Sequence, residues 1–279
     1  MNRRSFLISS GLLAGGLASG VYAWQVEPFW LEFVQRKMPI KHLPSGLEGK
    51  TLMQISDVHV GNNFDYQYII EAFKEAKTYQ PDIVVYTGDY VSYENEEQLS
   101  QMKEVFQYAV KGKLGTIGIL GNHDYGHKWA QEEVAQQIIG ILKEHDIPIL
   151  RNEAKKLAGL NIIGIDDYWA INFKPEELHS EFAKEDASIV LCHNPDVCDL
   201  DVWNGYQGWI LSGHTHGGQC KPPFLPPPIL PVKNKRYNAG EIDLEDGRKL
   251  YINRALGHYF QVRFNVRPEI TLFQLEAVS

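Results

Sequence analysis

The sequence predicts an α/β fold, and two patterns carry that prediction. Short apolar runs rich in β-branched residues alternate with stretches whose apolar residues recur at helical spacing. Several of the apolar runs end directly before a short motif that contains Asp, Asn or His. In α/β sheets, ligands gather at the carboxyl ends of the strands, where these motifs lie. The chain has 279 residues, which is enough for one large domain with a sizeable core.

The predicted elements follow one another in a regular order. Strands are expected at residues 51–55, 83–86, 116–120, 188–191 and 208–211, each of them before a polar motif. Helical stripes of apolar residues lie at 66–76, 99–109 and 134–142. Residues 221–232 contain six prolines, which predicts a stiff loop. Closing strands are expected at 249–253 and 269–275.

Five motifs at the strand ends offer ligands for metal ions. They are Asp57-Val58-His59, Gly88-Asp89, Gly121-Asn122-His123-Asp124, Cys192-His193 and Gly213-His214-Thr215-His216. Together they supply enough ligands for two metal ions that share one carboxylate, an arrangement that suits hydrolysis at phosphorus. Mixed oxygen and nitrogen ligands favour Mn, Fe or Zn over Mg and Ca, which prefer all-oxygen shells. The sequence therefore predicts two divalent metal ions as cofactors.

The order and spacing of these motifs resemble those of the calcineurin-like metallophosphoesterase superfamily. Asp57 and Asp89 are 32 positions apart and Asn122 follows Asp89 by 33, so each interval holds about one strand and one helix. The resemblance covers residues from about 47 to 275. The stretches EPFWLEF, GHTHGGQ and RFNVRPEI resemble the bacterial envelope-associated phosphodiesterase branch. The resemblance implies a metal-dependent phosphoric ester hydrolase with a four-layer αββα fold, in which helices flank two facing β-sheets.

The resemblance also implies a role for each motif residue. His123 would face the scissile phosphate as general acid or charge stabiliser and would not bind metal. A hydroxide that bridges the metals would attack phosphorus in line. The implied ligands are Asp57, His59 and His216 for the first metal, Asn122, His193 and His214 for the second, and Asp89 for both.

One position departs from the superfamily pattern. Many members have a second Asp three positions after the bridging one, where it orients the non-ligand His, but Ser92 occupies that place here. Either another group orients His123, with Asp124 and Asp65 as the candidates, or its role as an acid is weaker. The departure concerns His123 rather than the metal ligands.

The first 23 residues predict export rather than a part of the fold. Arg3 and Arg4 precede a weakly apolar run at residues 8–23, as in a signal that the twin-arginine translocase reads. The signal is either cleaved after Ala23 or kept as an N-terminal anchor. The expected location is the periplasm or the cell envelope.

An aromatic lead-in at residues 24–46 is expected before a phosphoesterase domain at 47–279. Its part from Trp24 to Met38 can lie at a membrane interface, where aromatic rings prefer to sit. It can also pack on the domain as the first element, which is the favoured alternative.

Charge and cysteine content narrow the possible partners. The formal net charge is -8, and it becomes -10 without residues 1–23, so no global basic field exists to hold a nucleic acid. A nuclease is therefore disfavoured. The three cysteines, Cys192, Cys198 and Cys220, contain no CxxC pair, and we expect no disulfide framework.

The leading hypothesis is an exported dinuclear-metal phosphoesterase that acts on a cell-envelope substrate. The aromatic lead-in and the apolar Pro-rich loop can receive acyl chains, which motivates an alternative, a UDP-diacylglucosamine-type lipid pyrophosphatase associated with the membrane surface. A catalytically inactive metal-binding envelope protein is the alternative from a different class.

Three further positions have two interpretations each. Arg263 is a candidate phosphate contact or a member of a structural ion pair. Lys221 begins the Pro-rich loop, which is expected either to form a wall of the substrate pocket or to be a surface connection. The pair Asp166-Asp167 is a turn or a sixth strand-end site.

Overall fold

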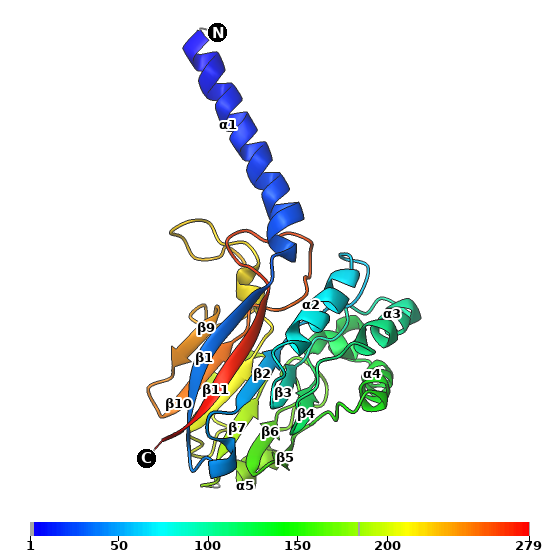
Figure 1. The fold of residues 1–279 in the computed structure, drawn as a ribbon, viewed down its shortest axis with the longest axis vertical. Helices are drawn as coiled ribbons and strands as arrows, with labels where there is room; N and C mark the ends of the chain where they lie inside the picture. Colours follow the sequence, from blue (N-terminus) through cyan, green and yellow to red (C-terminus); the bar gives the residue numbers. More distant parts are fainter. Residues whose placement is uncertain (1–2, 184, 279) are drawn as a thin grey trace.

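Two β-sheets pack face to face in the computed structural model, which describes residues 3–183 and 185–278. The first sheet contains, in spatial order, β1 (Glu32–Lys41), β11 (Glu269–Val278), β2 (Thr51–Ile55), β3 (Ile83–Thr87) and β4 (Gly115–Ile119). The second contains β5 (Glu153–Leu157), β6 (Leu160–Gly164), β7 (Ser188–Leu191), β8 (Gly208–Ser212), β10 (Arg248–Ile252) and β9 (Gly240–Asp243). The α/β arrangement of two facing sheets confirms the predicted fold class (Figure 1).

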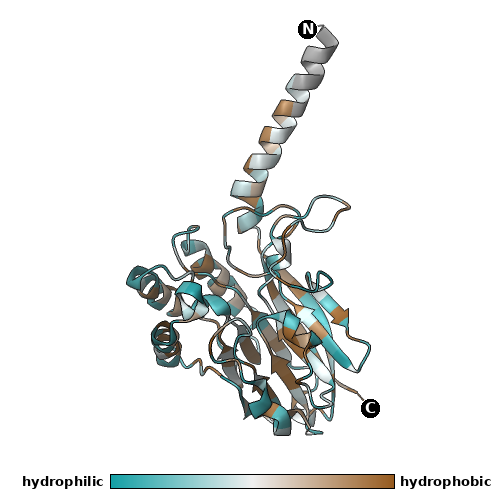
Figure 2. Ribbon diagram, turned by 180° about the vertical axis from the view of Figure 1, so that it is seen from behind, coloured by the Kyte–Doolittle hydropathy of each residue, from teal (hydrophilic) through white to brown (hydrophobic). Residues whose placement is uncertain are grey.

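Helices cover the outer face of the first sheet, and they are α2 (Gln67–Lys77), α3 (Glu96–Phe106) and α4 (Glu132–Glu144). The outer face of the second sheet has a thinner cover. Its only α-helix within the described residues is the single turn α5 (His179–Phe182), and short 3₁₀ turns at Pro175–Leu178 and Pro195–Asp199 lie in the same part of the chain. Figure 2 shows the hydrophobic strands at the centre and hydrophilic helix surfaces outside.

Alternation along the strands explains how one sheet serves two cores. In β3, Ile83 and Val85 belong to the core between the two sheets, while Val84 and Tyr86 belong to the core beneath the helices. Successive side chains of a strand point to opposite faces, so a strand that is buried on both faces must be apolar throughout. The continuous apolar runs in the sequence therefore correspond to strands that are buried on both faces.

The strand ends that carry the motifs meet at one edge. Strands β2, β3 and β4 are parallel, as are β7 and β8, so their carboxyl ends point the same way within each sheet. Gln54 ties the two sheets together near this edge, because its Nε2 donates to Thr87 Oγ1 at 3.1 Å and to the Ser212 carbonyl at 3.0 Å. The fold thus converts five separate motifs into one site.

The lead-in belongs in part to the folded domain. Strand β1 pairs in parallel with β11 over ten residue pairs, which places a strand of the first sheet before residue 47. The expected boundary at 47 is therefore too late. Glu27 and Pro28 are buried, whereas Trp24 and Trp30 are half exposed. The lead-in packs on the domain, as favoured from the sequence, but it leaves two aromatic rings at the surface.

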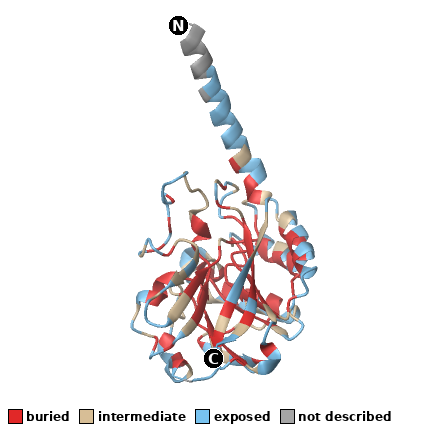
Figure 3. Ribbon diagram, turned by 60° about the vertical axis from the view of Figure 1, so that its left-hand side comes forward, coloured by how far each residue is buried: buried red, intermediate tan, exposed pale blue. Residues whose placement is uncertain are grey.

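Helix α1 (Arg3–Val21) projects from the body of the molecule, and its exposed surface is evident in Figure 3. The predicted export signal lies on this helix, but its Asn2 and the side chains of Arg3 and Arg4 lie outside the described residues. Among the described helices, none combines the length and the hydropathy that crossing a bilayer requires.

Two glycines allow the loops after β3 and β4 to touch. Gly88 has a φ of +93°, and a Cβ on it would lie 2.5 Å from the Gly121 nitrogen. A Cβ on Gly121 would collide with the Asp89 carboxylate. Glycine is needed at these positions because the backbones approach too closely for a side chain.

Replacing Gly88 with Ala should therefore lower the free energy of unfolding by about 2 kcal/mol or more, since both φ and the close contact oppose a side chain. Urea denaturation followed by circular dichroism measures the change. Gly140 is the matched control, because it lies in α4 with no atom within 4 Å of an added Cβ. Gly140→Ala should stabilise the protein by about 1 kcal/mol. Equal effects of the two substitutions would contradict the argument.

Candidate metal centre

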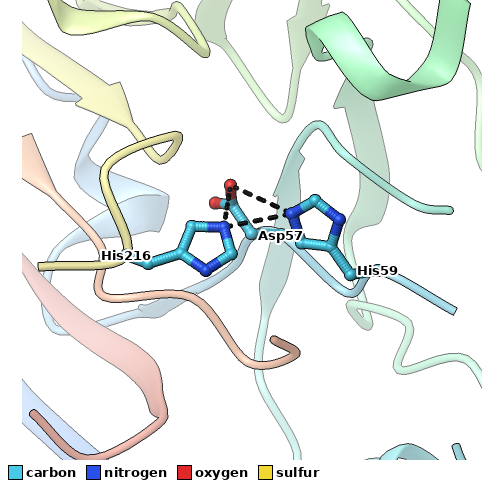
Figure 4. Close-up of side chains that lie close together, drawn as sticks. All are labelled: Asp57, His59 and His216. Atoms are coloured by element: carbon cyan, nitrogen blue, oxygen red, sulfur yellow. Dashed lines mark hydrogen bonds and ion pairs between the residues drawn. The ribbon is translucent and has the colours of Figure 1, made fainter. Parts of the chain in front are cut away.

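Two groups of potential metal ligands lie at the carboxyl edge of the sheets. Their members are Asp57, His59 and His216 in the first group, and Asp89, His193 and His214 in the second. Within each group the ligand atoms lie within 4.8 Å of one another, and all six residues are buried. Figure 4 shows the first group, in which the Nε2 atoms of His59 and His216 are 3.0 Å apart. Both groups combine residues that follow strands of the two different sheets.

The carboxylate of Asp89 lies between the two groups. Its Oδ2 is 3.1 Å from His193 Nε2 and 3.6 Å from His59 Nε2. Asp57 contacts its own group more closely, with Oδ1 3.2 Å from His216 Nε2. One carboxylate is therefore within reach of histidines from both groups, as a ligand shared by two ions must be.

Asn122 lies beside the second group. It is buried directly after β4, and it lines the same cavity as Asp89 and His214. Its Oδ1 has no hydrogen-bond partner among the described residues. A buried acceptor without a partner costs free energy, and a cation at this position would satisfy it.

Each histidine is held by one ring nitrogen, which leaves the other directed toward its group. His193 Nδ1 lies 2.7 Å from the Thr87 carbonyl, and His216 Nδ1 lies 3.1 Å from Gln219 Oε1. His214 is reversed, because its Nε2 contacts the Pro231 carbonyl at 2.9 Å. Such hydrogen bonds fix the ring and its tautomer in metal sites. His214 would therefore ligate through Nδ1, and the other histidines through Nε2.

Ser92 holds a potential metal ligand rather than His123. Its Oγ lies 3.0 Å from His59 Nδ1. The two carboxylates considered for orienting His123 are engaged elsewhere. Asp124 accepts hydrogen bonds from the backbone N–H groups of Asp89, Tyr90 and Gly121, at 2.7–2.9 Å. Asp65 accepts from the Gln67 N–H at the start of α2.

Packing and the backbone position His123. Its N–H donates to Asp89 Oδ1 at 2.8 Å, and its ring packs edge-on against His59, with a centroid distance of 5.0 Å. Tyr259 lies on another side of the ring, at 5.4 Å. Sequence reasoning missed Tyr259, because it belongs to a loop far along the chain and to none of the motifs.

The backbone at most of these ligand positions is strained. Positive φ values between 50° and 70° occur at Asp57, His59, Asp89, His214 and His216. Non-glycine residues rarely adopt this region, and each such residue costs on the order of 1–3 kcal/mol. The surrounding hydrogen bonds over-determine the conformation, as in the two bonds from the His214 N–H to the Asp57 carboxylate at 2.9 and 3.2 Å.

The electrostatics of the site favour an ionised carboxylate at Asp57 and neutral imidazoles at His59 and His214. At His193 the Asp89 and Asp57 carboxylates outweigh burial and raise the pKa of the imidazole well above its usual value, so this ring must lose its proton before it can bind a cation. Burial alone would raise the pKa of Asp57, but His193 and His216 outweigh it and lower that pKa to about 2. Burial, together with the charge of His193, lowers the pKa of His214 to about 3. Burial also lowers the pKa of His59 well below its usual value. Ionised carboxylates beside neutral imidazoles are the forms that ligate divalent cations.

The ligand groups open into a cavity of about 530 Å³ whose walls are largely apolar. Trp129 and Trp169 stack on each other at 4.8 Å on one wall, and Trp169 packs edge-on against His214 at 4.5 Å. Other apolar wall residues are Pro228, Ile229, Pro231, Tyr259, Phe260 and Val262. The Pro-rich loop is thus a wall of the pocket rather than a remote surface connection.

The remaining candidate residues lie away from the ligand groups. Arg263 is fully buried and does not line the cavity, and within the described residues its guanidinium forms no ion pair with a carboxylate. Its guanidinium donates to His258 Nδ1 at 2.9 Å and to backbone carbonyls, including that of Gly257 at 2.7 Å. These bonds fix the loop that carries Tyr259. Lys221 is partly exposed at the start of the Pro-rich loop, outside the cavity lining.

Asp166 and Asp167, which follow β6, have different surroundings. Asp166 accepts hydrogen bonds from the Tyr125 hydroxyl at 2.5 Å and from Arg151 Nε at 2.7 Å, which makes it a structural residue. Asp167 is buried with one carboxylate oxygen unpartnered among the described residues, and burial raises its pKa to about 7.

Fold and site together define a metal-dependent phosphoester hydrolase. Proteins with a similar sequence belong to the same class. The family model for calcineurin-like phosphoesterases matches residues 50–218. The uncharacterized metallophosphoesterase YkuE of Bacillus subtilis is 30% identical over 293 residues, covering 100% of this chain and 99% of that protein. The phosphodiesterase YaeI of Escherichia coli is 27% identical, with 99% of each chain covered.

A third relative has a different named activity. The UDP-2,3-diacylglucosamine pyrophosphatase LpxG of Chlamydia trachomatis is 26% identical, with 94% of each chain covered. The chain described here belongs to the calcineurin-like phosphoesterase family. Its Asp57 and Asp89 groups are two potential metal-binding sites of that family's kind.

Ser92→Ala should weaken the binding of a divalent metal by about 10- to 100-fold, because His59 loses the partner that fixes its ring. A competition titration with a metal-sensitive chelator measures the affinity. Ser100→Ala is the control, since Ser100 is exposed on α3 and its hydroxyl donates to the Glu96 carbonyl, away from the ligand groups. Unchanged affinity in Ser92→Ala would show that the contact does not matter for the site.

Proposed function

We propose that this protein is a two-metal phosphoesterase that hydrolyses a lipid-linked phosphoester of the cell envelope. The observation that carries the proposal is the position of the paired ligand groups, which meet at Asp89 beneath a largely apolar cavity. The ligand groups account for the chemistry, and the cavity walls account for the substrate class.

In this proposal, Asp89 is the ligand shared by both ions. Two divalent cations held there would supply Lewis acidity at phosphorus and an activated water at neutral pH. Mixed oxygen and nitrogen donors favour Mn, Fe or Zn. The first ion is assigned to Asp57, His59 and His216, and the second to Asn122, His193 and His214.

His123 acts on the leaving group. It lines the cavity next to Asp89 and is half-buried, so a phosphoester in the cavity lies within its reach. A protonated imidazole at this place donates a proton to the departing oxygen or stabilises its charge. Tyr259 and His59 pack against the ring and replace the missing carboxylate as its positioning contacts.

The cavity walls favour a substrate with an apolar part. A pocket lined by aromatic, aliphatic and proline side chains gains free energy from burying hydrocarbon, and gains little from a purely polar ester. The relatives include a named phosphodiesterase and a named diacylglucosamine pyrophosphatase, and both activities act on a P–O bond. A lipid pyrophosphate remains the second candidate substrate for the same reason.

The proposed location is the cell envelope, reached through the twin-arginine translocase. The basis is the pair Arg3 and Arg4 before an apolar run. A fusion of residues 1–46 to a reporter protein that folds before export tests this assignment, with Arg3→Lys plus Arg4→Lys as the control. A polyanionic partner such as nucleic acid is not expected, because the formal net charge is -8.

Asp89→Asn should abolish the hydrolysis of bis-p-nitrophenyl phosphate by protein loaded with Mn²⁺, because the shared ligand loses its charge. Release of p-nitrophenol measures activity, and metal analysis of the same sample counts bound ions. A chelator should reduce the wild-type rate to background, and added Mn²⁺ should restore it.

The companion variant is His123→Asn. It should keep both metals and lose activity by about 10²- to 10⁴-fold, the usual contribution of a general acid. A normal rate in His123→Asn would remove this residue from the proposed chemistry. A normal rate in Asp89→Asn would remove the shared-ligand assignment.

An acylated phosphoester should be hydrolysed with a higher kcat/KM than its deacylated headgroup, because the cavity buries hydrocarbon. Burial of only two methylene groups gives about a tenfold preference. A screen of envelope phospholipids and nucleotide-linked lipids, each paired with its deacylated form in the same detergent, measures the ratio. Equal values for every pair would contradict a lipid-linked substrate.

A further inference from the structure

The exposed apolar side chains of this protein gather at one end. Among the described residues, most of the large hydrophobic side chains that are exposed come from three segments, residues 13–30, 224–229 and 259–262. The most exposed is Phe224, at 104% of its reference area. Contiguous apolar surface of this kind marks an interaction site, whereas scattered single residues do not.

Backbone contacts join the three segments. The Arg263 N–H donates to the Ala23 carbonyl at 2.9 Å, and Gln261 Nε2 donates to the Trp24 carbonyl at 3.1 Å. The Lys221 N–H donates to the Phe264 carbonyl at 2.8 Å, which links the Pro-rich loop to the same strip. In Figure 1 both loops surround the base of α1.

We call this surface the apolar rim, and it consists of Trp24, Phe224, Leu225, Ile229, Phe260 and Val262. The rim is continuous with the wall of the metal cavity. Ile229, Phe260 and Val262 are exposed and also line that cavity. A partner that covers the rim therefore also faces the entrance to the active site.

Prolines present the tip of the rim in a fixed form. Phe224 and Leu225 stand between Pro223 and Pro226, and further prolines follow to Pro231. Proline fixes φ, so the loop loses little conformational entropy when its tip is covered. Exposed apolar side chains on a stiff loop can insert into a lipid layer, because the loop cannot easily fold back to bury them against the protein.

The charge distribution identifies the partner. The chain around the two rim loops, residues 213–240 and 254–268, contains seven Lys and Arg, of which Arg263 is buried, and none of the 35 Asp and Glu of the chain. In the lead-in, the acidic residue next to Trp24 and the rim loops is Glu27, which is buried and accepts a hydrogen bond from the Val266 N–H. The exposed charge beside the rim loops is therefore basic in an otherwise acidic protein. Basic residues beside exposed aromatic and aliphatic groups match an anionic phospholipid surface.

We propose that the apolar rim docks on an anionic lipid surface, with the metal cavity opening toward the lipid. The role of this docking rests on the proposed function, because docking would give the active site access to a lipid-linked phosphoester from the membrane plane. Binding itself requires only the rim, so it can be tested without any turnover.

The test is vesicle flotation of the full-length chain with phosphatidylglycerol-containing vesicles. Phe224→Ser combined with Leu225→Ser should reduce the bound fraction by about tenfold or more, because two apolar side chains lose their insertion. Neither residue lines the cavity, so hydrolysis of bis-p-nitrophenyl phosphate should be unchanged. The matched control is Tyr108→Ser with Leu114→Ser, which removes two exposed apolar residues outside the rim.

A second measurement isolates the rim from any contribution of α1. A photo-reactive benzoylphenylalanine placed at Phe224 should crosslink to lipid upon illumination, whereas the same group at Tyr108 should not. Vesicles of phosphatidylcholine alone should bind more weakly, and added salt should weaken binding to the anionic ones.

Three outcomes would overturn the docking proposal. They are equal flotation of the rim and control variants, crosslinking at Phe224 to a second copy of the chain instead of lipid, and equal crosslinking at both positions. Loss of bis-p-nitrophenyl phosphate hydrolysis in Asp89→Asn is independent of these results. Failure of the docking proposal and failure of the proposed function are thus separable.

Discussion

The structure depends on keeping the Asp89 carboxylate buried and ionised between two sets of histidines. Burial alone would raise the pKa of this group, but His193 and His123 hold it well below its usual value. The backbone around Asp89 also helps to hold its carboxylate in this position. Gly121 leaves room for the carboxylate, and Asp124 holds the Asp89 N–H at 2.9 Å. A buried, ionised carboxylate must be neutralised by nearby cations, and a pair of divalent ions would do so.

The two packed sheets supply the stability that offsets the strained backbone of the metal site. Strained φ values at five ligand positions cost stability locally, while continuous cores on both sides of the first sheet supply it. These five positions follow the ends of β2, β3 and β8, where the rigid sheets meet the loops. Rigid strands fix the ligands, and the loops beyond them are free to shape the pocket.

The ligand groups and the apolar cavity above them lie at the same edge of the molecule. The Pro-rich loop and the loop fixed by Arg263 build the apolar cavity above the ligand groups. The lead-in contributes as well, because Glu27 accepts a hydrogen bond from the Val266 N–H in the second of these loops at 2.5 Å. The segment that follows the predicted signal is therefore connected through the protein to the wall of the pocket. The proposed docking of the apolar rim on a lipid surface would turn this cavity toward the lipid.

The sequence by itself determined the fold class, the central strands and the residues that the structure gathers into two potential metal-binding groups. Buried strands need continuous apolar runs, and metals need particular donor atoms. It did not determine β1, an edge strand whose charged residues break that apolar signal. Only the tertiary structure decided that Ser92 contacts His59, that Arg263 fixes a loop, and that Tyr259 lies beside His123. These contacts join residues far apart along the chain, and their geometry depends on how the two sheets pack.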